Sequence, residues 1–341
     1  MTPHTAAIGA PTAAEACAVR PVAVLDAARR TTACPGRDLV IASDPEFRLG
    51  LATVGAITGD PVAFASTHAL VVFKPDSLIT GQALRLLALL TEGGFTPTAF
   101  RTGNISSLTQ RALWRRQFGY SSPERIALTE RYFALGPSVV ALFRATTNGD
   151  TLPASVRLTE LKGSTHPERR GPHHWRSVLT PVNRLLNLFH AADEPADVLR
   201  EAAVLSGGGA RLADLVRDST ARAAAGPSPA RALEAQLRAF EERFNAAVPA
   251  ASEPACAATR HLRDCQAPSF TDLVTVVRHD HGGEFCLECF DTSLDALCAP
   301  PSEWARLAVA GDEIPAFDPA MRELADTRKA SADDWRARAL S

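Results

Sequence analysis

The middle of the chain alternates between short apolar runs and longer stretches with helical spacing. Runs typical of buried strands occur at Ala69–Phe73, Phe95–Arg101, Ser138–Arg144 and Leu185–His190. Apolar residues at helical spacing, with serine or proline at several of the starts, predict helices at Gly81–Leu90, Ser106–Phe118, Pro123–Leu135, Leu152–Leu161 and Pro195–Leu205. This order predicts an α+β fold, a ferredoxin-like βαββαβ antiparallel sheet with an inserted helical hairpin.

The pattern changes at both ends of this unit and suggests where domains begin and end. We expect a mobile tail at 1–16, an N-terminal extension at 17–65 and the sheet domain at 66–208. Residues 210–341 are predicted to form a mainly helical C-terminal extension or small domain of unknown role. The glycines at 207–209 could form a phosphate cradle, but no Gly-Lys-Ser/Thr follows, so a linker is favoured.

Composition excludes some classes of function. The net charge of −2 provides no basic field for nucleic acid, and no apolar run is long enough to span a membrane. The N-terminus lacks the pattern of a secretory signal, and seven cysteines are an odd number, so we expect reduced thiols and a cytoplasmic protein. Lysine is scarce, since Lys74, Lys162 and Lys329 are the lysines among 36 basic residues. A lysine kept against this bias is a candidate for a specific role, although chance remains an alternative for Lys162 and Lys329.

Four short motifs and two further residues occur in a recognisable order. The motifs are Val-Val-Phe-Lys-Pro-Asp at 71–76, Gly-Pro-Ser-Val-Val at 136–140, Gly-Ser-Thr-His-Pro at 163–167 and Asn-Leu-Phe-His-Ala-Ala-Asp at 187–193. Arg176 follows the third motif, and Glu201 lies beyond the fourth. Together, over roughly residues 66–208, they resemble the nucleoside diphosphate kinase family.

The resemblance implies a ping-pong transfer in which the γ-phosphoryl group of a nucleoside triphosphate passes through His190 to a diphosphate. A neutral imidazole is a competent nucleophile near pH 7, and Glu201 would hold its second nitrogen. Lys74 and Arg176 would bind phosphate oxygens. ATP or another triphosphate would be the donor, Mg²⁺ would arrive with the nucleotide, and a homo-oligomer is implied by the resemblance alone.

Three further residues have polar roles by resemblance and simpler alternatives. Thr165 and Asn187 would add neutral hydrogen bonds to the nucleotide, but both could be turn residues. Asp193 would position the loop after His190, and it could also cap the helix that begins at Pro195.

The chain departs from the family pattern at several positions. Ala191-Ala192 replaces Gly-Ser after the histidine. A second phosphate-binding arginine would align with Thr159. Arg157, two residues away and about 200° round a helix, is the candidate for that role. Trp114 falls near the family's hairpin tyrosine and could support Lys74. The stretch 122–126, where the family has a base-stacking aromatic, contains none.

The histidines and cysteines outside these motifs could suggest metal binding. Cys286 and Cys289 form a Cys-x-x-Cys, with other cysteines and histidines nearby, but the second half of a zinc pattern is missing. His166, His173 and His174 are interpreted as a solvated loop. We therefore predict no protein-bound metal.

Three functions fit these observations. The first is the nucleotide phosphotransferase described above. The second is a specialised kinase for an unusual nucleotide or metabolite on the same scaffold, favoured by the missing aromatic and the C-terminal extension. The third is a non-catalytic regulator that binds nucleotides, which the retained His190 and Glu201 oppose.

Overall fold

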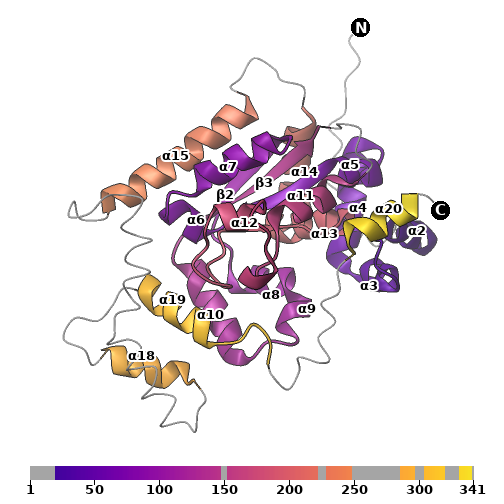
Figure 1. Cartoon of the computed structure of the whole chain (residues 1–341). Coiled ribbons are helices and arrows are strands. Elements are labelled where there is room, and N and C mark those ends of the chain that lie inside the picture. Colours follow the sequence, from indigo (N-terminus) through magenta and orange to yellow (C-terminus); the bar gives the residue numbers. More distant parts are fainter. Residues whose placement is uncertain are drawn as a thin grey trace.

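A four-stranded antiparallel sheet lies at the centre of the structure, a computed structural model that describes residues 20–146, 152–221, 228–247, 285–295, 303–318 and 330–339 (Figure 1). Its strands are β1 (His68–Phe73), β2 (Phe95–Gly103), β3 (Ser138–Ala145) and β4 (Phe189–Ala191), in the order β2-β3-β1-β4. Because β3 lies between β1 and β2, the connection from β1 to β2 crosses over one strand. The predicted α+β class and the first three strands are confirmed. The fourth strand is shorter than predicted and has His190 at its middle residue.

Helices cover both faces of this sheet. The face that β1 presents through Ala69, Val71 and Phe73 packs on α7 (Ala83–Glu92), α11 (Ala154–Lys162), α12 (Trp175–Val178) and α15 (Pro229–Ala247). The face with Leu70 and Val72 packs on α4 (Pro45–Thr58), α5 (Pro61–Thr67), α10 (Pro123–Ala134), α13 (Pro195–Ser206) and α14 (Gly209–Thr220). Burial on both faces explains why the strands are continuous apolar runs rather than alternating ones.

The remaining described helices lie at the ends and edges of this core. They are α2 (Pro21–Thr31), α3 (Arg37–Ser43), α6 (Pro75–Ile79), α8 (Ser107–Leu113), α9 (Arg115–Phe118), α18 (Leu287–Asp295), α19 (Glu303–Glu313) and α20 (Ala332–Ala339), with a 3-10 turn at Pro167–Arg169. Ser106 and Ser122 accept hydrogen bonds from the amides of Thr109 and Arg125, which fixes the starts of α8 and α10. The helical hairpin between β2 and β3 is therefore present where the sequence predicts it.

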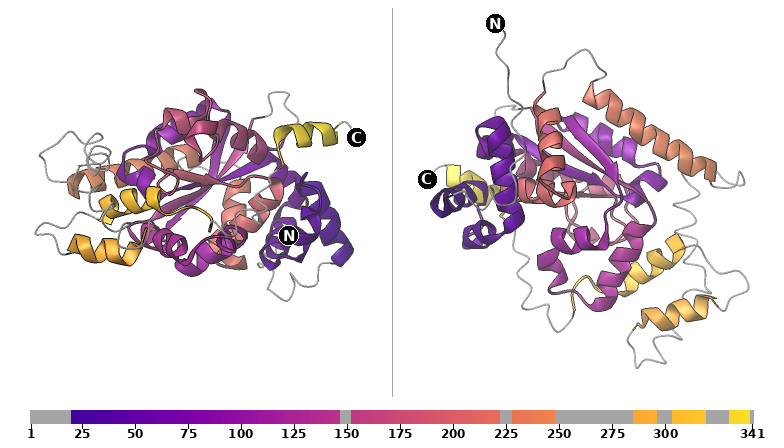
Figure 2. Two further views of the ribbon diagram at one scale, coloured as in Figure 1. Left: turned by 60° about the horizontal axis from the view of Figure 1, so that its bottom comes forward. Right: turned by 180° about the vertical axis from the view of Figure 1, so that it is seen from behind.

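The N-terminal extension is helical in its described part and packs directly on α13 (Figure 2). At the crossing of α4 and α13, a Cβ added to Gly50 would clash with the carbonyl oxygen of Leu199. Only glycine permits this approach of two helix backbones. The extension is thus part of the layer that positions α13.

The described C-terminal helices also pack on the sheet domain. Helix α14 contributes to one core and α15 to the other, while α19 lies along α10 and α20 contacts α11 (Figure 1). Of the helices in the described ranges, none is by itself long and apolar enough to cross a membrane. The bent pair α4 and α5 meets the length and composition criteria only when taken together, with a 98° bend between the two helices.

Candidate functional site

His190 and Glu201 form the hydrogen bond that the sequence led us to expect. His190 pairs with Val72 in the register of β4 and β1, and Glu201 lies on the following helix, α13. The Nε2 of His190 lies 2.7 Å from Oε2 of Glu201, with 18% of the histidine side chain and 9% of the glutamate side chain exposed. A carboxylate accepts the Nε2 proton, so the Nδ1 lone pair is available. Among the described residues, Nδ1 of His190 has no hydrogen-bond partner.

The aromatic ring beside Lys74 is not the one that the sequence predicted. Trp114 lies edge-on to the ring of His190, with centroids 5.8 Å apart, and does not support Lys74. The ring against the Lys74 ammonium, 4.9 Å from Nζ to centroid, belongs to Tyr132. Trp114 ends α8 and points toward β4, whereas Tyr132 lies on the buried side of α10. Tyr132 was missed because its proximity to β1 is set by helix packing rather than by a local motif.

Lys74 follows the end of β1 and is almost fully buried, at 5% exposure. Its Nζ donates to the carbonyl of Leu185 and to Oδ1 of Asn187, both at 2.8 Å. Burial lowers the pKa of Lys74 to about 8; Asp76 opposes this shift, and the charges of Arg176 and Arg125 add to it. Within the described part of the chain, no carboxylate forms an ion pair with Lys74.

Asp76 fixes the loop that precedes β4. Its carboxylate accepts from the Tyr132 hydroxyl and, at 2.8 Å, from the amide of Leu188. Leu188 has a φ of 73°, a conformation that a leucine adopts only when its surroundings impose it. The amide of Lys74 donates to the Leu188 carbonyl at 3.0 Å, so the lysine and the loop are held together. Asp76 is in the first motif, but the motif alone indicated no separate role for this residue.

Arg176, on α12, connects the loop of the third motif to β4. It donates to the carbonyls of Gly163 at 2.8 Å and Phe189 at 3.2 Å, and its guanidinium lies 5.3 Å from the centre of the Phe189 ring. Burial lowers its pKa to about 10, with Asp193 opposing the shift. Like Lys74, Arg176 forms no ion pair among the described residues, so the structure brings two buried cations to the β4 region with neutral partners.

Arg157, one of the predicted site residues, does not join this group. Arg157 donates to the carbonyls of Gly93 and Gly94 at 3.0 and 3.2 Å and lies over the ring of Phe95, so the helix rotation seen in the sequence directs it away from β4. The predicted role of Arg157 in phosphate binding is therefore not supported. The backbone carbonyl of Thr165 accepts a hydrogen bond from Arg170 at 2.6 Å, and within the described ranges its side chain has no hydrogen-bond partner, so its predicted role stays a prediction.

Asp193 is held by α11. Its Oδ1 accepts from Nζ of Lys162 at 3.0 Å and from the hydroxyl of Thr159 at 3.3 Å. Lys162 also donates to the carbonyl of Ala191 at 3.3 Å, which ties it to the strand that carries His190. The residue that caps α13 is Glu194, without a side-chain cap bond, so the capping alternative for Asp193 is wrong. The scarcity of lysine was the only sequence signal for Lys162.

A second buried charge cluster lies at the start of α13. Arg37 donates to Glu194 and, at 2.6 Å, to Asp197, while the Thr32 hydroxyl and the Ala33 amide each donate to Glu194 at 2.8 Å. Burial raises the pKa values of Glu194 and Asp197, and Arg37 opposes both shifts. Here every buried charge faces an opposite charge, which characterises a structural network.

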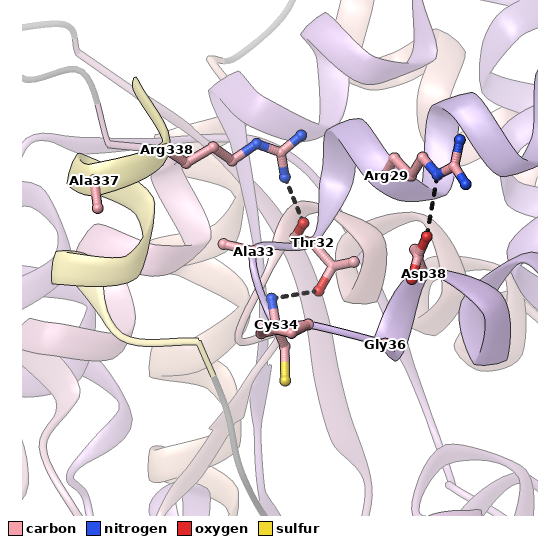
Figure 3. A pocket seen from close by; sticks show the side chains of 9 residues that line it. Arg29, Thr32, Ala33, Cys34, Gly36, Asp38, Ala337 and Arg338 are labelled. Atoms are coloured by element: carbon pink, nitrogen blue, oxygen red, sulfur yellow. Dashed lines mark hydrogen bonds and ion pairs between the residues drawn. The ribbon is translucent and has the colours of Figure 1, made fainter. Parts of the chain in front are cut away.

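The loop of this network borders a 410 Å³ cavity between the α2–α3 segment and α20 (Figure 3). Arg338 donates to the Thr32 carbonyl, and Arg29 pairs with Asp38 at 3.2 Å. None of the residues at the His190 site lines this cavity. It is therefore a separate feature of the N-terminal helices.

The histidines and cysteines show no metal arrangement in the described residues. No group of three or more His, Cys, Asp or Glu side chains there could hold an ion. His166 pairs with Glu168 at 3.0 Å, and His173 and His174 contact each other in the loop before α12. The other members of the candidate zinc cluster, Cys256, His261, Cys265, His279, His281 and Cys298, lie outside the described residues.

Comparisons with known proteins add little to this geometry. No protein-family model matches the chain, and no curated protein matches it either. Among solved structures, the chain is similar to the nucleoside diphosphate kinase of Aquifex aeolicus, with a TM-score of 0.34 and 19% identity. The match covers 40% of this chain and 93% of that chain, and the similarity is weak.

Proposed function

We propose that this protein is a phosphotransferase that moves the γ-phosphoryl group of a nucleoside triphosphate to a diphosphate acceptor through a phosphohistidine on His190. The observation that carries the proposal is the hydrogen bond between Nε2 of His190 and Glu201, which leaves Nδ1 as the nucleophilic atom. The strand order β2-β3-β1-β4, with every neighbouring pair antiparallel, is also the order expected of the predicted ferredoxin-like βαββαβ fold.

The transfer needs two displacements at phosphorus. In the first, the Nδ1 lone pair forms a bond to the γ-phosphorus while the bond to the bridging oxygen breaks and the diphosphate leaves. In the second, a terminal oxygen of the acceptor diphosphate attacks the same phosphorus and the P–N bond breaks. Phosphorylation makes the ring cationic, and Glu201 stabilises that charge through Nε2 without leaving its position.

Lys74 and Arg176 are suited to neutralise the phosphate oxygens. Both are buried and are satisfied by carbonyl and amide oxygens, an arrangement that keeps a desolvated charge without an opposite charge. An anion arriving at these groups forms charge-assisted bonds, each contributing about 1.5–3 kcal/mol. The contrast with the paired Arg37 supports a ligand rather than a structural role.

Mg²⁺ would be held mainly by the phosphate oxygens of the nucleotide. Mg²⁺ usually binds through substrate phosphates, water and only one or two carboxylates. Its contribution would be to neutralise charge on the transferring group, while the chain's own residues bind and orient.

One observation favours a specialised acceptor over a common nucleotide. The start of α10 presents Arg125, which is buried at 7% exposure, and residues 122–126 contain no aromatic ring for a base to stack on. Recognition at this position would then depend on charge more than on stacking.

Labelling with γ-³²P-ATP tests the proposal. We expect acid-labile, base-stable label on the wild-type chain, none on His190→Ala, and at least a tenfold slower reaction for Glu201→Gln. His166→Ala, in an exposed loop, is the matched control and should label normally. Undiminished labelling of His190→Ala would show that the nucleophile lies elsewhere.

A further inference from the structure

The C-terminal segment 303–318 contains α19, which lies beside α10 of the helical hairpin (Figure 1) and also contacts the loop before β4. On the hairpin side, Nη1 of Arg125 donates to the carbonyls of Gly311 at 3.3 Å and Ile314 at 3.1 Å. Next to it, Ser121 donates to the Ala316 carbonyl at 2.8 Å. On the other side, Nδ2 of Asn183 donates to the Ala308 carbonyl at 2.9 Å. One segment therefore joins the helical hairpin to the loop before β4.

Only one layer of side chains separates this segment from Lys74. Trp304 of α19 packs edge-on against Tyr132, with centroids 6.1 Å apart, and the Tyr132 ring contacts the Lys74 ammonium. Asn183, which holds α19, also accepts from the amide of Leu185, whose carbonyl accepts from Lys74. A movement of α19 would therefore change the contacts of Lys74.

Arg125 carries a buried charge that only neutral groups satisfy. Its bonds go to the two carbonyls at the C-terminal end of α19, and in the described ranges it forms no ion pair. Burial lowers the pKa of Arg125 to about 10; the charge of Arg184 adds to this shift, and that of Asp312 opposes it. Its own charge helps to lower the pKa of Lys74, which places the two cations in one electrostatic neighbourhood.

We infer that Arg125 is a further anion-binding residue of the site, covered in this structure by the C-terminal end of α19, and that a polyphosphate group displaces this end when it binds. The inference rests on the proposed function. A phosphate group offers the guanidinium an opposite charge and bidentate hydrogen bonds, which the two carbonyls do not, and this favours the exchange. The ligand group recognised at Arg125 is therefore a phosphate rather than a flat base.

The opposite end of α19 has a different attachment. Arg131 pairs there with Glu303 at 2.7 Å and with Asp291 of α18 at 2.6 Å. These ion pairs do not involve the cations near Lys74, so the N-terminal end of α19 can stay attached while the Arg125 end moves. Weakening them with Arg131→Gln should make the cover easier to displace.

Calorimetric titration of the full chain with inorganic pyrophosphate tests whether Arg125 binds the ligand or only holds α19 in place. We expect Arg125→Gln to weaken binding at least tenfold and Arg125→Lys to weaken it less, because the charge is kept. Arg131→Gln should bind a few-fold more tightly than wild type, and Arg157→Gln should not change. If Arg125 only holds α19 in place, Arg125→Gln would release the helix and bind pyrophosphate as well as or better than wild type, which would overturn the inference.

Hydrogen exchange provides the second readout. Pyrophosphate should increase exchange at the backbone amides of α19 in wild type, and unchanged protection of these amides in the bound state would overturn the covering role. Neither measurement needs a phosphohistidine, so they can succeed if His190 labelling fails. Conversely, normal labelling of His190 with pyrophosphate binding unaffected by Arg125→Gln would reject this inference alone.

Discussion

Two buried charge clusters lie along the segment from β4 to α13, and they are satisfied in opposite ways. At the start of α13, Arg37 faces two carboxylates, Glu194 and Asp197. Near β4, Lys74 and Arg176 are bonded to carbonyl and amide oxygens, and no ion pair of theirs is found among the described residues. The first cluster is complete within the protein, and the second has the composition of a site that an anion would complete.

The comparison shows why burial of charge alone does not identify function. Both clusters are desolvated and both contain perturbed pKa values, but among the described residues the first cation forms ion pairs with two carboxylates and the cations of the second form none. The property that indicates a ligand site is a buried cation without an ion-pair partner among the described residues. Substitutions in the first cluster should therefore lower stability, whereas substitutions in the second should impair function and spare stability.

The largest effect is expected in the complete cluster. Arg37→Met leaves Glu194 and Asp197 buried beside each other without a cation, so the free energy of unfolding should fall by about 3–5 kcal/mol. Urea denaturation at pH 7 measures this change. A loss below about 1 kcal/mol would remove the distinction between the two clusters.

In the incomplete cluster, Lys74→Met should affect function and spare stability. We expect histidine labelling to slow about 10- to 150-fold, the equivalent of one charge-assisted bond of about 1.5–3 kcal/mol, with a melting temperature equal to or above that of wild type. Lys162→Met is the matched control, because Lys162 is equally buried but pairs with Asp193. A lower melting temperature for Lys74→Met than for Lys162→Met would contradict the comparison.

The pKa of Lys74 predicts opposite pH trends for stability and for anion binding. Between its folded value of about 8 and its ordinary value of 10.5, the unfolded chain binds more protons than the folded one, so stability rises with pH in this window. The slope attributable to Lys74 is at most about 1.4 kcal/mol per pH unit. Pyrophosphate affinity should fall over the same window as the ammonium is lost. Denaturation and calorimetry from pH 7.5 to 9.5, with Lys74→Met subtracted, measure both trends, and parallel trends would be inconsistent with this assignment.

The smallest effect is expected at Arg157. Its guanidinium holds the carbonyls of Gly93 and Gly94 at the turn before β2, so Arg157→Gln should change the rate of histidine labelling by less than twofold. A single-turnover labelling assay is sufficient to check this. A tenfold loss would place Arg157 in the anion site despite its position on α11.

Local patterns in the sequence predicted the helices and strands well, and the contacts between distant residues less well. The apolar runs predicted β1, β2 and β3 because burial on both faces leaves a continuous signal. The run at Leu185–His190 was longer than β4, since the residues before Phe189 form a loop shaped by bonds to Asp76 and Lys74. Those bonds come from the distant β1 end, and no local pattern encodes them.

In the candidate site, too, contacts between residues close in sequence were predicted and contacts between distant elements were not. His190 and Glu201 are separated by a fixed spacing along one strand and helix, so their contact was predictable. Tyr132 and Lys162 reach the site from other elements, and their roles follow from packing alone. The helices after residue 208 were expected to form an extension of their own, whereas α14 and α15 complete the two cores of the sheet domain.

The strand order has a consequence for how fast the chain can fold. Lys74 and its partner Asn187 are 113 positions apart in the sequence, and β1 pairs with β3 and β4 but not with β2, its neighbour along the chain. Contacts between such distant segments slow folding, because loop entropy is lost before the pairing energy is gained. Of the four strands in the described ranges, β4 lies farthest from β1 along the chain, and it carries His190. Recovery of histidine labelling during refolding would therefore report the final strand pairing, later than the recovery of helical circular dichroism.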